Sequence, residues 1–206
     1  MRPRCESLGH EEGENMSDVK NIMIVGVGGQ GALLASKTLG QVLLDAGYDV
    51  KVSEVHGMSQ RGGSVVTYVR YGEKVYSPIV DKGEADFIVS FELLEAARYT
   101  EYLKKGGHIV VNTQQIDPMP VITGAAKYPE NLVEKMKKAG FNVDALDCLD
   151  LAEQAGTAKA VNIVLMGLLS KYMDFPEEKW LEAIEKLVKP QFLEVNKKAF
   201  ALGRNA

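Results

Sequence analysis

The sequence predicts an α/β fold, a three-layer α/β/α sandwich around a mixed, mostly parallel sheet. Short apolar runs of strand length alternate along the chain with longer segments of helical spacing. A glycine-rich turn joins the first such strand to the first helix. With 206 residues, 46% of them hydrophobic, the chain is long enough to bury a core of one domain.

The first strand, turn and helix make up the most informative stretch. Ile22–Gly31 is an apolar run that ends in glycines, and Ala32–Ala46 has the apolar spacing of a helix. Gly26, Gly28 and Gly31 match the pattern G-x-G-x-x-G. Glycines between a strand and a helix allow close approach to an anion, which then faces backbone N–H groups and the positive end of the helix dipole. The sequence therefore predicts a phosphate site, a carboxylate site or a contact with a partner's backbone.

The second strand is expected at Asp49–Val55, after the first helix ends at Gly47. Glu54 lies near its end, about where a dinucleotide-binding fold places the acid that binds ribose. A stand-alone NAD(P)-binding protein is therefore one interpretation of the chain.

A polar, glycine-rich loop follows at Gly57–Gly63. Arg61 offers the planar donor fork that suits a carboxylate or phosphate, and Ser59 and Gln60 add neutral donors. This loop opens at the same sheet edge as the glycine turn, so we expect it to bind a ligand or a partner. The alternative is a solvated connection. His56 has no partner at the spacing of a catalytic triad and is interpreted as structural.

The rest of the chain completes a Rossmann-like sheet. Ser64–Tyr71 and Val75–Val80 are predicted to form a β-hairpin insertion, which makes the sheet mixed. Further strands are expected at Phe87–Ser90, His108–Asn112 and Asn142–Leu146, and helices at Glu92–Lys104, Pro129–Ala139, Ala158–Met173, Pro176–Leu187 and Gln191–Leu202. The prolines of Asp117–Pro120 should prevent regular structure there.

Composition excludes several classes of protein. The net charge of −4 without a basic stripe argues against nucleic acid, and no apolar stretch is long enough to span a membrane. No secretory leader is evident, so a cytoplasmic location is expected. Cys5 and Cys148 alone cannot supply the four thiolates of an iron–sulfur cluster. Residues 1–20 are predicted to be a disordered tail, and residues 21–206 a single domain.

Four other polar residues are singled out, three of them with structural interpretations. Glu92 and Glu95 lie near a helix start, where the dipole favours negative charge. His108 begins a buried strand. Asn162 interrupts the apolar run 160–169, so it either caps a neighbouring loop or faces a partner.

Several spaced motifs resemble the gamma-type domain of 2-oxoacid:ferredoxin oxidoreductases. They are Gly26–Gly31, His56–Gly63, Ser90–Glu92 with Glu95–Arg98, and Gly106–Asn112, and the resemblance covers about residues 20–204. The chain is most similar to the branch of that family that oxidises indolepyruvate and other aryl pyruvates.

The resemblance implies a small subunit that is inactive alone and holds no cofactor or metal itself. A large alpha subunit would carry thiamine diphosphate, Mg²⁺ and [4Fe–4S] clusters, with coenzyme A as co-substrate and ferredoxin as electron acceptor. The resemblance makes a stand-alone NAD(P)-binding protein, or a nucleotide-sensing scaffold, a weaker interpretation of this chain. The candidate contacts to coenzyme A, to the oxoacid or to the partner are Gly26, Gly28, Gly29, Gln30, Gly31, Ser59, Gln60 and Arg61.

Overall fold

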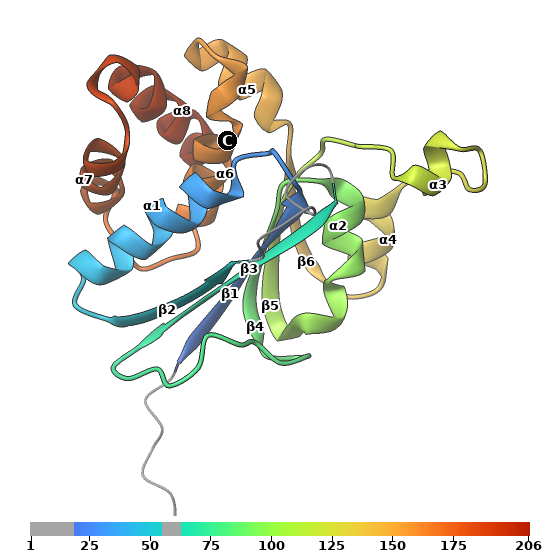
Figure 1. Cartoon of the computed structure of the whole chain (residues 1–206), viewed down its shortest axis with the longest axis horizontal. Helices are drawn as coiled ribbons and strands as arrows, with labels where there is room; N and C mark the ends of the chain where they lie inside the picture. The colour runs from blue at the N-terminus through green and yellow to red at the C-terminus, as the bar shows by residue number, and fades with distance from the viewer. Residues whose placement is uncertain (1–18, 55–62) are drawn as a thin grey trace, which may run out of the picture.

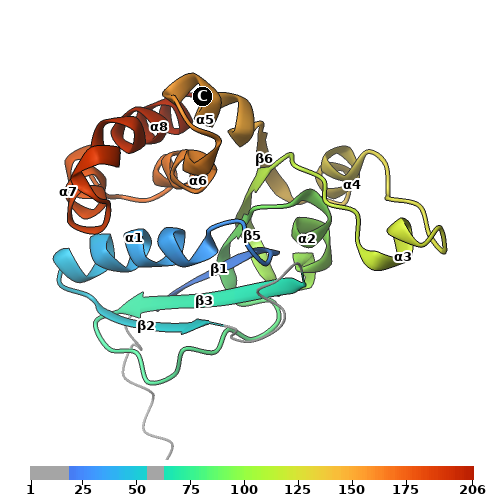
Figure 2. The same ribbon diagram turned by 45° about the horizontal axis from the view of Figure 1, so that its top comes forward.

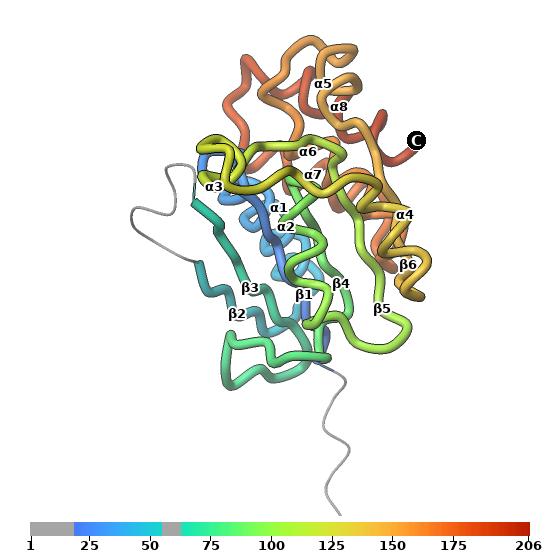
Figure 3. The backbone as a smooth tube through the Cα atoms, turned by 90° about the vertical axis from the view of Figure 1, so that its right-hand side faces the viewer, coloured from blue at the N-terminus to red at the C-terminus, as the bar shows by residue number. Residues whose placement is uncertain are grey.

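A six-stranded sheet in the order β2-β3-β1-β4-β5-β6 forms the centre of the molecule. The computed structural model describes residues 19–54 and 63–206, and Figure 3 shows the strands side by side in this order. The strands are β1 (Lys20–Val27), β2 (Asp49–Glu54), β3 (Ser64–Gly72), β4 (Ala85–Ser90), β5 (Leu103–Asn112) and β6 (Asn142–Leu146).

The sheet is mixed, as predicted, but its antiparallel part differs from the expected hairpin. β1, β4, β5 and β6 pair in parallel, whereas β3 is antiparallel to both β1 and β2. The prediction of a strand at Val75–Val80 is wrong. Strand β3 already pairs with β1 on one edge and with β2 on the other, so it has no free edge for a hairpin partner. The N–H of Val75 instead donates to the carboxylate of Asp49 at 2.9 Å. Pro78 also lacks the N–H that a paired strand needs.

Helices cover both faces of the sheet, which confirms the three-layer sandwich (Figures 1 and 2). One face carries α1, α5, α6, α7 and α8, and the other carries α2 and α4. The bounds are α1 (Ala32–Asp45), α2 (Leu93–Arg98), α3 (Met119–Ile122), α4 (Leu132–Lys138), α5 (Cys148–Ala155), α6 (Val161–Ser170), α7 (Glu177–Leu187) and α8 (Leu193–Asn205), with 3-10 turns at Thr100–Tyr102, Ala158–Ala160 and Pro190–Phe192.

Three helices differ from the prediction. The helix expected over Glu92–Lys104 ends at Arg98, and β5 begins at Leu103, which pairs with Ala85 of β4. Helix α5 was missed, although Asp147 caps it by accepting the N–H groups of residues 149 and 150. The expectation that Asp117–Pro120 prevents regular structure is wrong, because the single-turn helix α3 begins at Met119 and proline is tolerated in the first turn of a helix.

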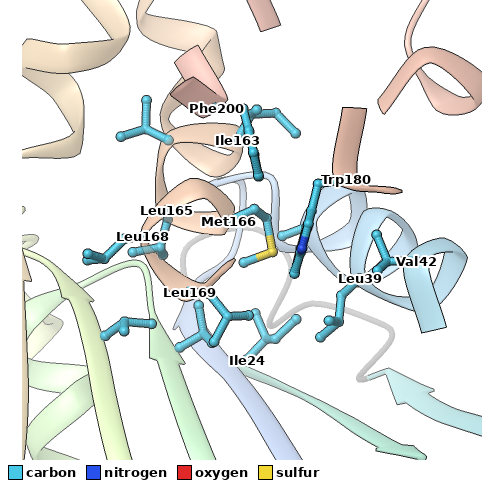
Figure 4. Packing of buried hydrophobic residues seen from close by; sticks show 14 of the residues in the cluster. Ile24, Leu39, Val42, Ile163, Leu165, Met166, Leu168, Leu169, Trp180 and Phe200 are labelled. Carbon is cyan, nitrogen blue, oxygen red and sulfur yellow. The ribbon is translucent and has the colours of Figure 1, made fainter. Parts of the chain in front are cut away.

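Two apolar cores flank the sheet. On the α1 face, Trp180 of α7 packs with Met166 and Leu39 in the cluster that Figure 4 shows. Helices α6 and α8 cross with their backbones in contact. Only glycine fits at position 203 of this crossing, since a Cβ there would overlap the carbonyl of Val164. Within the described ranges, no helix combines the length and the apolar character needed to cross a bilayer.

Candidate functional site

The candidate site lies where the parallel strands end. The turn after β1 leads directly into α1, and Figure 1 shows it at the arrowhead of β1. The N–H of Gly28 donates to the carbonyl of Gly63 at 2.9 Å, which fixes the turn to the start of β3. The glycine turn thus lies at the carboxyl edge of the sheet, as predicted, and this is where open α/β sheets bind ligands.

Three of the four glycines in the turn have a conformational or steric reason. A Cβ on Gly26 would lie 2.9 Å from both Gln30 Oε1 and Phe91 Cβ. Gly29 and Gly31 have φ angles of 101° and 87°, which disfavour any residue with a side chain. Gly31 also packs against Asn162, whose Nδ2 donates to the Gly31 carbonyl at 3.3 Å. Of the two roles left open for Asn162, the structure shows the neighbouring-loop contact.

Gln30 connects three loops at this edge instead of pointing freely to solvent. Its Oε1 accepts the N–H of Val27 at 2.7 Å, so its Nε2 must be the donor end. Nε2 donates to the carbonyl of Phe91 at 3.0 Å and to Gln114 Oε1 at 3.1 Å. The side chain therefore holds the β1, β4 and β5 loops in a fixed relation.

The side-chain amides of Asn112 and Gln114 also belong to this network, and no role was predicted for either residue from the sequence. Asn112 Oδ1 accepts the N–H of Cys148 at 3.2 Å, and its Nδ2 donates to the Phe91 carbonyl at 3.1 Å and toward Gln114 at 3.4 Å. Gln30 and Asn112 thus both donate to Gln114 Oε1. The amide NH2 of Gln114 takes part in neither of these two hydrogen bonds. The signal was present, because polar residues directly after the apolar core of β5 fall at the carboxyl edge of the sheet.

The start of α1 presents donors to a cavity of about 310 Å³. The helix has no side-chain cap, and its N-cap residue is Gly31. No described residue accepts a hydrogen bond from the N–H groups of Gly31, Ala32 or Leu33. The cavity is lined by this turn and by Glu54, which accepts a hydrogen bond from Ser36 of α1 at 2.7 Å. N–H groups at a helix start that have no acceptor among the described residues favour an anion or another acceptor.

The two glutamates at the start of α2 have the structural role expected of them. Glu92 is 1% exposed, and its Oε2 accepts the N–H of Glu95 as an N-cap. Its Oε1 accepts the Ile116 N–H at 3.1 Å and the Tyr128 hydroxyl at 2.6 Å. The pKa of Tyr128 is raised by burial and by this carboxylate. Glu92 therefore fixes both ends of the segment 116–128, which carries α3.

The structure places none of the other candidate residues at the glycine turn. Ser59, Gln60 and Arg61, together with His56, fall outside the described residues. His108 has the structural contact expected of it, at 2.6 Å from Asp144. Cys148 is a buried free thiol whose pKa burial raises to about 12. No group of three or more His, Cys, Asp or Glu among the described residues could hold a metal ion.

The sheet order bears on the dinucleotide alternative. Glu54 does border the glycine-turn cavity, but β3 lies between β1 and β2. In the classic dinucleotide fold those two strands are neighbours, and the acid at the end of the second one reaches the ribose. The order found here does not favour that interpretation.

Comparisons with known proteins agree with this architecture. A family model described as pyruvate ferredoxin/flavodoxin oxidoreductase matches residues 21–206. The chain is 49% identical to "Indolepyruvate oxidoreductase subunit IorB" of Thermococcus kodakarensis, over 90% of this chain and 95% of the relative. It is 47% identical to the protein of the same name from Pyrococcus horikoshii, over 90% and 95%. A crystal structure of pyruvate oxidoreductase subunit PORC from Thermotoga maritima superposes with a TM-score of 0.68 at 25% identity, over 91% of this chain and 96% of that one.

Proposed function

The chain belongs to the pyruvate ferredoxin/flavodoxin oxidoreductase family, and on this premise we propose that it is the small, gamma-type subunit of a 2-oxoacid:ferredoxin oxidoreductase. The observation that carries the proposal is the near full-length match to relatives that are themselves named as subunits. We propose that residues 21–206 form one gamma-type domain and that the protein is cytoplasmic.

The proposed reaction is the oxidative decarboxylation of indolepyruvate or another aryl pyruvate. Coenzyme A takes up the acyl group, and ferredoxin takes up the two electrons. The substrate class rests on the names of the two relatives at 47–49% identity, both of which are called indolepyruvate oxidoreductase subunits. Substrate preference is therefore the part that a panel of oxoacids must test.

The reactive cofactors are assigned to a larger alpha subunit. Thiamine diphosphate with Mg²⁺ supplies the decarboxylation chemistry when bound there, and [4Fe–4S] clusters carry electrons. A cluster takes four thiolate ligands, whereas this chain has two cysteines, of which Cys148 is buried. The residues of this chain do not fit a cluster, so we assign no electron-transfer step to it.

The glycine turn is proposed to hold an anionic group of coenzyme A or of the oxoacid, or a carbonyl of the partner subunit. Its support is the set of N–H groups at the start of α1 beside a cavity of about 310 Å³. Ser59, Gln60 and Arg61 are proposed to complete the contact on the basis of the sequence alone. The bonds of Gln30 suggest that it shapes the turn instead of touching the ligand.

The experiment is co-purification with the large subunit encoded by the same organism. Iron, thiamine diphosphate and oxidation of indolepyruvate, phenylpyruvate and pyruvate are measured on the complex. The proposal expects a stable complex, with cofactors in the large subunit and aryl pyruvates preferred. Failure of the two chains to associate would contradict the subunit role, whereas a preference for pyruvate would contradict only the substrate class.

The contact residues are tested separately in the active complex. Arg61→Ala should raise the KM for coenzyme A or for the oxoacid, with Lys105→Ala as a control that removes a cation at the opposite end of the sheet. An unchanged KM for both substrates would remove the ligand role and leave a role in structure or assembly.

A further inference from the structure

A second cavity, of about 480 Å³, opens at the amino ends of the parallel strands. It therefore lies at the sheet edge opposite the glycine turn. The turn between α6 and α7 borders it, and so do the ends of β1, β3, β4 and β5. Its volume is in the range of small-molecule sites, which are about 300–1,000 Å³.

Aromatic rings border this amino-edge cavity on two sides. Tyr71 of β3 contacts Tyr48 at 5.2 Å and Phe175 at 6.5 Å between ring centroids. On β5, His108 stacks with Tyr172 at 4.1 Å and an interplanar angle of 27°. Three strand spacings separate β3 from β5 in the sheet order, which is about 14 Å. The cavity of about 480 Å³ between these two walls has the volume to hold a flat ring system.

The imidazole of His108 is held in one orientation. Asp144 of β6 accepts its Nε2–H at 2.6 Å, and the same carboxylate oxygen accepts the Tyr172 hydroxyl. Burial raises the pKa of Asp144, but these two hydrogen bonds lower it, and the pKa stays below its usual value. With Asp144 ionised, Nε2 carries the proton, and no described residue uses the other ring nitrogen. The second wall is thus rigid and has a hydrogen-bonding edge.

A cation with spare donors lies at one end of the cavity. Asp86 is 7% exposed, accepts the Asn21 N–H at 2.8 Å and pairs with Lys104. An ammonium group has three N–H donors, and the contact with Asp86 uses one of them. Asp174 also lines the cavity from the α6–α7 turn and would repel an anion near it. Lys20 also lines the cavity and pairs with Asp86 at 3.8 Å, so this end carries the positive charge that favours an anionic group.

We propose that the amino-edge cavity binds a small aromatic carboxylate. The ring lies between the Tyr71 and His108 walls, beside Phe87 of β4, which also lines the space. The carboxylate pairs with Lys104. This site is additional to the proposed subunit role and does not depend on it, because it uses neither the glycine turn nor the partner.

Calorimetric titration of the full chain tests the proposal. The probes are indole-3-acetate and phenylacetate, with acetate and indole as ligands that lack the ring or the acid. Aromatic acids should bind saturably, and either control should bind at least about tenfold more weakly, which is ~1.4 kcal/mol. Absence of saturable binding by either aromatic acid at ligand concentrations well above about 1 mM would overturn the proposal. Indole binding as tightly as its acid would do the same.

A matched pair of lysine variants and a spectrum of the wild type locate the site. Lys104→Met should weaken binding at least about tenfold, whereas Lys105→Met on the neighbouring exposed residue should not. In an amide NMR spectrum of the wild type, the signals of Gly106 and Gly107, which line the cavity, should move on titration. Equal binding by both variants, or shifts confined to Gly28 and Gly29, would overturn the assignment.

Discussion

Alanine substitutions in the glycine turn test its geometry with numbers taken from the structure. Gly29 and Gly31 both have positive φ, so alanine at either position costs about 1–2 kcal/mol of backbone strain. Nothing lies within 4 Å of a Cβ on Gly29, whereas a Cβ on Gly31 would lie 2.9 Å from Asn162 Nδ2. Gly31→Ala must therefore also displace Asn162 and break its hydrogen bond to the Gly31 carbonyl, worth about 1 kcal/mol.

We expect Gly29→Ala to cost about 1–2 kcal/mol and Gly31→Ala about 2–3 kcal/mol of unfolding free energy. The Asn162 Cβ is 3.6 Å from the new methyl position, an ordinary contact. In an Asn162→Ala background, Gly31→Ala should therefore cost only as much as Gly29→Ala. The assay is urea unfolding followed by circular dichroism, arranged as a double-mutant cycle. Equal costs for the two single glycine variants, or strict additivity in the cycle, would refute the reasoning.

Three further predictions concern the body of the domain. Gly203→Ala at the α6–α8 crossing should lower the unfolding free energy by about 2 kcal/mol or more. Gly40→Ala, in α1 with open space around it, should raise the unfolding free energy by about 0.5–1 kcal/mol, and urea midpoints in the opposite order would contradict this. The folded pKa of Asp144 is lowered, so its stabilising effect is present above about pH 4 and is lost as pH falls through the folded pKa. Asp144→Asn should then lose less stability than the wild type between about pH 5 and pH 3, as measured by thermal melting; parallel losses would count against it. The Cys148 thiol is buried with a raised pKa, so a Cys5→Ser variant should react with iodoacetamide at pH 8 only on unfolding, and rapid labelling of the folded protein would be inconsistent with that burial.

Local chemistry explains what the sequence could predict. The turn over Gly26–Gly31 was predictable because strand, glycines and helix are adjacent in the chain, and because Gly29 and Gly31 are required by their own positive φ. A structural role for Glu92 at the helix start was predictable for the same reason, since one of its partners is the nearby N–H of Glu95.

Long-range pairing explains what it could not predict. The alternation of β3 fits a hairpin with Val75–Val80 as well as it fits a strand between β1 and β2, and only the assembled sheet decides between them. Likewise, the hydrogen bond of Glu92 to Tyr128 joins residues 36 positions apart. The amide network of Gln30, Asn112 and Gln114 also required the three loops to be placed together.

The most direct test of the proposed subunit role is turnover by the separated and recombined chains. This chain, the large subunit and their mixture are each assayed for reduction of ferredoxin that depends on both an oxoacid and coenzyme A. The account predicts no turnover by this chain alone and restoration of full activity when it is added to the large subunit. Oxidation of indolepyruvate by this chain alone would contradict it, as would a large subunit whose activity does not change when this chain is added.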